Sequence, residues 1–145
     1  MATGLLRSFR GARRARAADL AVAQGAYYAL TGVWALVDIR SFQAVTGPKT
    51  DLWLVKTIGV LVFVIGGTLI AGGVRRRPTR ELGLLAAGSA AGLAAIDTVY
   101  SAKRRISPIY LLDAAVEVLL LGLWILPRRH PRQETSLRTS SIATT

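Results

Sequence analysis

Ionisable side chains lie within or at the ends of long apolar stretches, where a membrane would penalise a charge. They are Asp38, Lys56, Asp97, Asp113 and Glu117. A charge at mid-bilayer costs about 2.5–3.5 kcal/mol even on a lenient insertion scale, so such groups normally face the interior of a helix bundle and carry function. Four acids beside one amine indicate a site that binds a proton, a cation or a lipophilic amine.

Asp113 and Glu117 are four residues apart, so their negative charges would repel each other on one face of a helix. Protonation of Glu117, a pairing of Lys56 with one acid, or a cation bound between the acids would relieve that repulsion. Ion pairing and helix capping would explain Asp38, Lys56 and one further acid as well as a binding role does. They leave Glu117 without a base, and we therefore expect Glu117 to exchange protons with a substrate.

Aromatic side chains share the faces of these acids. One stripe, at three- and four-residue spacing, contains Gln24, Tyr27, Thr31, Trp34 and Asp38, and a second contains Tyr110, Asp113, Glu117 and Trp124. Aromatic rings attract cations through their faces, although anchoring at the membrane interface explains the tryptophans and tyrosines near segment ends as well. The predicted ligand-binding residues are Glu117, Asp113, Asp97, Lys56, Asp38, Tyr27, Trp34 and Tyr110.

Four apolar segments position these side chains, at about 20–38, 52–73, 82–100 and 108–126. Each is close to the ~20 residues with which a helix crosses a bilayer, and backbone groups in lipid must be satisfied within the helix. The sequence therefore predicts an all-α fold, a four-helix transmembrane bundle over residues 19–127. A basic lead, 1–18, precedes it and a disordered polar tail, 128–145, follows. The connection 40–51 would lie over the outer mouth of the acids, as a lid or as a plain connector.

The basic residues indicate the orientation. The N-terminus, residues 74–81 and the C-terminus carry 13 of the 19 lysines and arginines, against 8 acids in the whole chain. The positive-inside rule then predicts a multi-pass protein of the inner (plasma) membrane with both termini cytoplasmic. The acids would lie in the outer half of the bundle, and the inner half would be apolar. The basic clusters suit lipid head groups, so we expect the bilayer and not nucleic acid as the partner.

Several classes of site are excluded. The chain has no cysteine and one histidine, which exclude thiolate chemistry and histidine-rich metal sites. It shows no nucleophile with a base and no phosphate loop, so we expect no enzyme, no metal and no cofactor. The excess of arginine over lysine, with abundant alanine and glycine, suggests a GC-rich bacterial genome.

Residues 82–100 are rich in small side chains, with Gly88 and Gly92 in a G-x-x-x-G pair. Small residues let helix backbones approach closely in membranes. The pair predicts close packing inside the bundle or, alternatively, a homodimer.

Chain length, the four-span layout and the run Gly25-Ala26-Tyr27-Tyr28 resemble the DoxX-like group of small bacterial membrane proteins, over residues 20–126. That resemblance implies an accessory or structural subunit of a membrane complex, in which the polar cluster serves helix packing. The acids instead favour a binding or transport protein, similar in logic to small multidrug transporters with their buried glutamate. Both functions stay open at this point.

Overall fold

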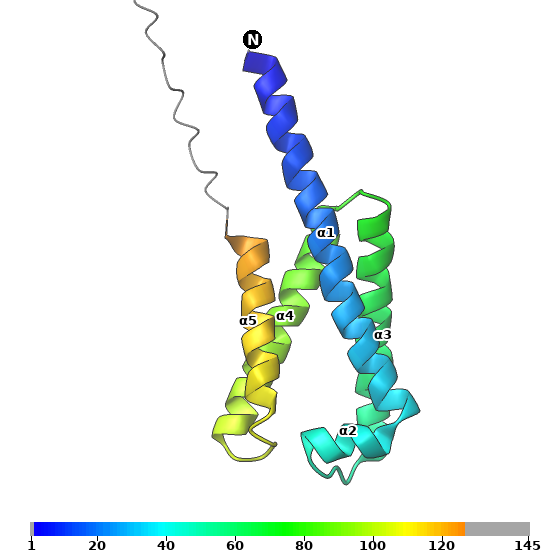
Figure 1. Cartoon of the computed structure of the whole chain (residues 1–145). Helices are drawn as coiled ribbons and strands as arrows, with labels where there is room; N and C mark the ends of the chain where they lie inside the picture. The colour runs from blue at the N-terminus through cyan, green and yellow to red at the C-terminus, as the bar shows by residue number, and fades with distance from the viewer. Residues whose placement is uncertain (1, 127–145) are drawn as a thin grey trace, which may run out of the picture.

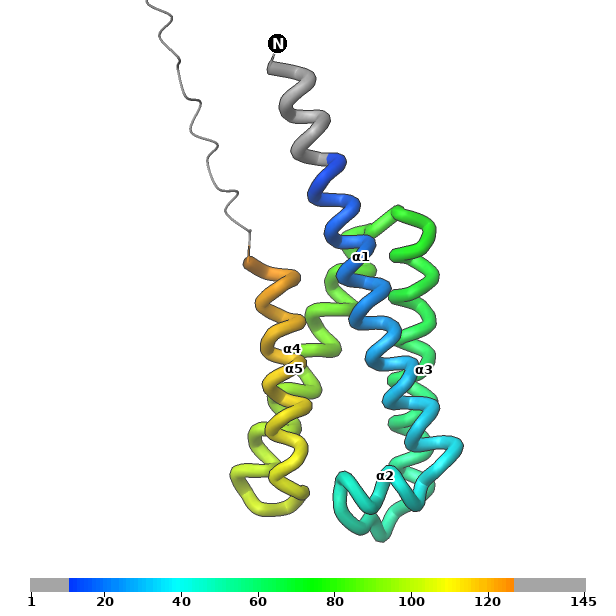
Figure 2. The backbone as a smooth tube through the Cα atoms, viewed as in Figure 1, coloured from blue at the N-terminus to red at the C-terminus, as the bar shows by residue number. Residues whose placement is uncertain are grey.

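The structure, a computed structural model, describes residues 2–126, with side chains from residue 11 onward (Figures 1 and 2). It contains five helices and no strand in that range. They are α1 (Ala2–Val37), α2 (Ile39–Thr46), α3 (Leu52–Val74), α4 (Arg80–Ala102) and α5 (Tyr110–Ile125). The all-α prediction is confirmed, and the predicted disordered tail lies outside the described residues.

Three helical stretches are long and apolar enough to cross a membrane: Gly11–Val37 of α1, all of α3 and all of α4. Many of their large apolar side chains are exposed, such as Leu30 and Leu84, which is the arrangement expected of a multi-pass protein surrounded by lipid. The fourth predicted segment forms α5, which has 16 residues. At 1.5 Å per residue it is about 24 Å long, shorter than a hydrocarbon core of about 30 Å.

The predicted division between a basic lead and the first span is not a break in the helix. α1 begins at Ala2 and continues through the arginines to Val37 (Figure 1). Arginine and alanine are good helix formers, and the first proline of the chain is Pro48. One helix therefore joins the basic lead to the membrane.

α1 and α3 lie side by side and antiparallel, and glycines set their spacing (Figure 2). A Cβ added at Gly25 would lie 2.6 Å from the carbonyl oxygen of Gly66, and one at Gly32 would lie 2.5 Å from that of Gly59. One at Gly73 would lie 2.6 Å from the Ala18 oxygen. These small residues recur every seven positions on both helices, as in a coiled coil whose backbones are in contact.

Gly88 and Gly92 have no such role. A Cβ at either position would meet no atom within 4 Å, and both glycines are exposed on α4. The prediction that this pair packs inside the bundle is wrong. The close backbone contact instead uses glycines at seven-residue spacing in the first and second apolar segments.

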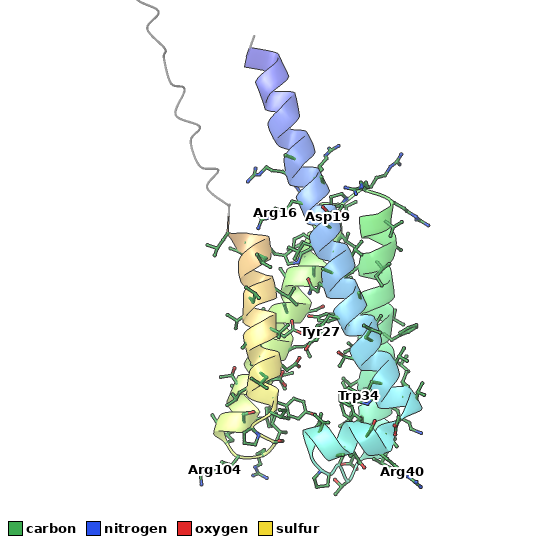
Figure 3. All side chains as sticks on the ribbon, viewed as in Figure 1. Arg16, Asp19, Tyr27, Trp34, Arg40 and Arg104 are labelled. Carbon is green, nitrogen blue, oxygen red and sulfur yellow. The ribbon has the colours of Figure 1, made fainter. Side chains whose placement is uncertain are left out.

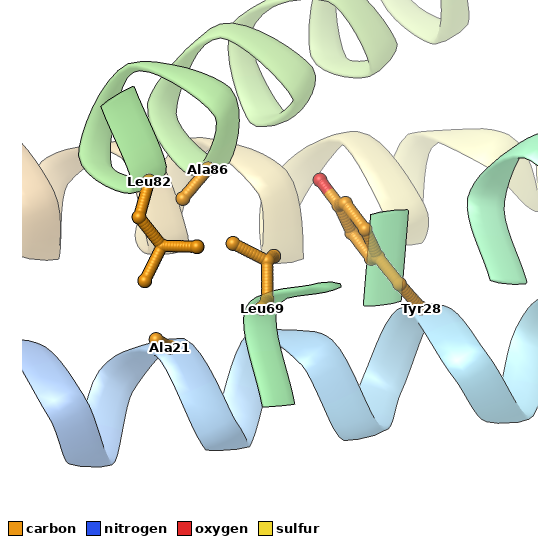
Figure 4. Close-up of a cluster of buried hydrophobic side chains, with 5 residues drawn as sticks. All are labelled: Ala21, Tyr28, Leu69, Leu82 and Ala86. Carbon is orange, nitrogen blue, oxygen red and sulfur yellow. The ribbon is translucent and has the colours of Figure 1, made fainter. Parts of the chain in front are cut away.

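α4 and α5 form a second antiparallel pair, connected through residues 103–109 (Figure 1). The two pairs meet in a small apolar core of Ala21, Tyr28, Leu69, Leu82 and Ala86 (Figure 4). α2 lies across the end at which α1 finishes and α5 begins (Figure 1). The molecule thus consists of a tight α1/α3 pair and an α4/α5 pair, with α2 at one end.

Candidate functional site

Two tyrosines of α1 bind two acids of α5. The Tyr28 hydroxyl donates to Oε2 of Glu117 at 2.8 Å, and the Tyr27 hydroxyl donates to Oδ1 of Asp113. Tyr28 and Glu117 are each 1% exposed, so this hydrogen bond is closed to solvent. The prediction that Asp113 and Glu117 point to one side of their helix is confirmed. Figure 3 shows Tyr27 between α1 and α5.

A second polar contact joins the helix pairs nearer the N-terminal end of α1. Gln24 is fully buried, donates from Nε2 to the Ala86 oxygen at 2.9 Å, and accepts from Nε1 of Trp124 at 2.7 Å. Arg16 donates to the Leu123 oxygen at 3.0 Å. These contacts lie in the half of the bundle that was predicted to be apolar, and that prediction is wrong. Polar side chains there use their hydrogen bonds to connect α1 with α4 and α5.

Asp97 completes the acid cluster from α4. It is 5% exposed, and its carboxyl group lies near that of Asp113. Its Oδ2 and the Ser101 Oγ are buried without a hydrogen-bond partner. The hydroxyl groups of Thr31 and Thr68, unlike that of Ser101, donate to the backbone carbonyl four residues earlier. Asp97 is buried and Asp113 is partly exposed, and negative charges on these neighbouring carboxyl groups would repel each other; a proton or a cation near them would relieve that repulsion.

An open cleft of about 280 Å³ reaches this cluster from the α2 end. It is lined by Tyr27, Thr31, Trp34, Phe42, Thr46, Ile109, Tyr110, Leu112, Asp113 and Val116. Asp113 is the one acid among these lining residues. Asp97 and Glu117 lie behind the wall, so a ligand in the cleft meets Asp113 first.

Asp38 and Lys56 lie apart from the other acids, and the prediction that all five groups share one interior is wrong for both. Asp38 is exposed and accepts the Ser41 N–H at 3.1 Å as the N-cap of α2, which holds the pKa of its carboxyl below the usual range. Lys56 is exposed on α3. Within the described side chains the one ion pair is Arg76–Asp19, at 3.5 Å, so Lys56 pairs with no acid there.

The remaining predicted residues, Trp34 and Tyr110, line the cleft. The predicted ligand set omits Tyr28 and Phe42. Tyr28 could have been found from its spacing, since it follows the polar Gln24 by one helical turn. Phe42 belongs to α2, whose start is signalled by Asp38 with Ser41 three residues later.

The connection 40–51 is in part a helix, and α2 supplies Phe42 and Thr46 to the cleft. It lies at the mouth of the acid cluster, as expected from the sequence. Within the described residues, no group of three histidine, cysteine or acidic side chains is placed to hold a metal ion.

The fold and the cleft define an α-helical protein suited to a membrane, with a carboxyl cluster at the end of an aromatic cleft. No family model, curated protein or solved structure matches the chain. Its function is therefore argued from the geometry of the cleft.

Proposed function

We propose that this protein is a four-pass protein of the inner membrane whose cleft binds a small lipophilic organic cation. One observation carries the proposal: Asp113 is the one charged side chain in the wall of a cleft lined mainly by aromatic and aliphatic side chains, with two threonines. A carboxylate supplies the opposite charge, and aromatic rings attract a cation through their faces by about 0.5–2 kcal/mol each, more when water is excluded. Such a lining selects a ligand that is apolar over most of its surface and positive at one point.

The size of the cleft limits the ligand. About 280 Å³ lies just below the roughly 300–1,000 Å³ of sites for drug-sized molecules. A single aromatic ring with a substituted ammonium group suits this space better than a large multi-ring cation. Benzyltrimethylammonium is a matching probe, because it has no N–H and so reports charge and aromatic attraction alone.

The acids behind the wall would give the cleft a means of exchange. In this proposal a proton on the buried Asp97 offsets the repulsion between the two neighbouring carboxyl groups while the cleft is empty. A cation bound beside Asp113 would then offset the repulsion between the carboxyl groups in place of that proton. Glu117, which accepts from the Tyr28 hydroxyl at 2.8 Å, is a third carboxyl group, buried behind the wall of the cleft. Exchange of a cation for a proton is therefore the mechanism that these positions favour.

In this proposal α5 is the fourth pass, and both termini face the cytoplasm. The arginines of residues 75–77 support that orientation, since they belong to the connection between α3 and α4, which lies at the opposite end from α2 (Figure 1). The cleft then opens to the outer side.

The test is the equilibrium binding of benzyltrimethylammonium to the purified full chain in lipid nanodiscs. We expect saturable binding that falls at least tenfold in Asp113→Asn and is unchanged in Asp19→Asn, whose exposed acid pairs with Arg76 far from the cleft, at the end of the bundle opposite α2 (Figure 3). Neopentylbenzene, the uncharged analogue of the same shape, should not compete. Equal binding by wild type and Asp113→Asn, or equal competition by the neutral analogue, would refute the proposal.

A second candidate function is that of an accessory or structural subunit in a DoxX-like membrane complex. One observation favours it: the hydrogen bonds from Gln24, Tyr27 and Tyr28 are the principal polar contacts between the two helix pairs. In that case the acids serve packing. Glu117→Gln should then destabilise the protein in detergent, whereas a stable variant with altered proton-coupled uptake of lipophilic cations by vesicles would favour transport.

A further inference from the structure

Lys49 brings a positive charge of the protein itself against two residues that line the cleft, Tyr110 and Thr46. Its ammonium nitrogen lies 4.9 Å from the centre of the Tyr110 ring, on the ring face. Tyr110 lines the cleft one helical turn before Asp113. A face that could attract the cation of a ligand is thus already occupied by a cation of the chain.

The connection between α2 and α3 holds Lys49 in this position through several contacts. The Lys49 ammonium donates to the Thr46 oxygen at 3.1 Å, and Nε2 of Gln43 donates to the Lys49 oxygen at 3.2 Å. Gly47 has a φ of +88°, a backbone conformation that favours glycine, and turns the chain after α2. A Cβ at Gly47 would lie 3.6 Å from that of Ser107, so the turn rests against the residues before α5. Lys49 is therefore placed by the backbone and is not a freely moving surface side chain.

We propose that Lys49 is a specificity-determining residue, a tethered cation that competes with the ligand for Tyr110 and so sets which organic cations enter. This inference rests on the proposed function. A ligand must either displace the ammonium from Tyr110 or bind deeper, against Asp113, with the Lys49 charge still over Tyr110. Cations that the aromatic lining attracts only weakly are excluded from the cleft. Cations with a second positive charge that would lie near Lys49 are excluded as well. A compact monocation with an aromatic ring can replace the contact that it breaks.

Removal of the charge gives a direct measure of this competition. Lys49→Gln keeps a side-chain donor for the Thr46 oxygen but removes the positive charge, whereas Lys49→Arg keeps the charge. We expect Lys49→Gln to bind benzyltrimethylammonium about 3- to 10-fold more tightly than wild type, because the change removes one like charge from a partly solvated site. Lys49→Arg should bind as wild type does.

The chain offers a matched control. Lys103 lies over Tyr100 at 5.8 Å, in the same kind of contact, but neither residue lines the cleft. Lys103→Gln should leave the binding constant unchanged. The gain in Lys49→Gln should shrink as salt is added, because screening weakens the repulsion that the lysine exerts on the ligand.

The outcomes separate this inference from the function on which it rests. If wild type binds the cation and Lys49→Gln binds it equally well or more weakly, the inference is overturned and the proposed function is left intact. Binding that is detected in Lys49→Gln and not in wild type would support both. No binding to either protein would overturn both, and a similar gain in Lys103→Gln would show an effect of net charge and overturn the role of Lys49.

Discussion

The contact between α1 and α3 gives a sharp prediction, because two neighbouring glycines of α3 differ only in what they face. Gly66 is buried, and a Cβ there would lie 2.6 Å from the Gly25 oxygen and 2.6 Å from the Ala29 nitrogen. Gly67 is exposed, and a Cβ there would meet no atom within 4 Å. Replacement of each by alanine adds the same methyl group to the same helix.

The expected magnitudes follow from these distances. At Gly66 the methyl group would be about 0.8 Å closer than an ordinary van der Waals contact, and the atoms that it meets are backbone, so the helices must move apart. Overpacking of this kind costs about 1–3 kcal/mol. At Gly67 alanine should stabilise the helix by about 0.5–1 kcal/mol, because glycine loses more conformational freedom on folding. The two variants should therefore differ by roughly 1.5–4 kcal/mol.

The assay is the free energy of unfolding of the full chain in mixed micelles, followed by circular dichroism as a denaturing detergent is added. Gly66→Ala should unfold at a lower detergent fraction than wild type, and Gly67→Ala at an equal or higher one. Equal stabilities for the two variants, or a less stable Gly67→Ala, would refute the assigned contact between α1 and α3.

Two further predictions concern side chains at and beside the site. Tyr28→Phe removes the hydrogen-bond donor to the Glu117 carboxyl group, which is 1% exposed, and should lower the free energy of unfolding by about 1–2 kcal/mol. Tyr100→Phe, at an exposed ring, should change the free energy of unfolding little. Equal effects of the two changes in the same unfolding assay would contradict the assigned hydrogen bond. The second concerns the α2 cap: the pKa of Asp38 is lowered by the Ser41 N–H, so the cap stabilises α2 above the usual pKa and is lost as pH falls through the lowered pKa. The amide resonance of Ser41 in an NMR titration should therefore move only at a pH below the usual aspartate range, and a midpoint at or above that range would show that the cap is not formed.

Much of the fold could be predicted from hydropathy, because the need to satisfy backbone groups in lipid leaves few alternatives. The predicted segment 52–73 corresponds to α3 (Leu52–Val74), and 82–100 to α4 (Arg80–Ala102). What hydropathy could not show is how the helices pair. Gly88 and Gly92 form a G-x-x-x-G pair but face outward, while Gly25 and Gly66 belong to no such pair and form the contact.

The candidate site was predictable where helical periodicity decides which side chains share a face. Tyr27, Asp113 and Glu117 were predicted from their spacing, and the structure brings them together. Lys56 was grouped with them on depth alone, and depth does not fix the rotation of a helix about its axis, so it could not show that Lys56 points away. Asp38 was also placed on the stripe of Tyr27 and Trp34 by its spacing, but α1 ends at Val37 and Asp38 caps α2 instead.

The central claim, a cleft that opens to the outer side and takes a cation beside Asp113, is tested most directly by cysteine labelling. The chain has no native cysteine. Thr31→Cys places a thiol in the cleft, and Thr68→Cys places one on the exposed face of α3; both threonines bond to the carbonyl four residues earlier, so the two changes are matched. A membrane-impermeant cationic thiol reagent added from the outer side should label Thr31→Cys, more slowly when benzyltrimethylammonium is present, and should leave Thr68→Cys unlabelled. Labelling of Thr31→Cys only from the cytoplasmic side, or at a rate that the cation does not change, would contradict the account.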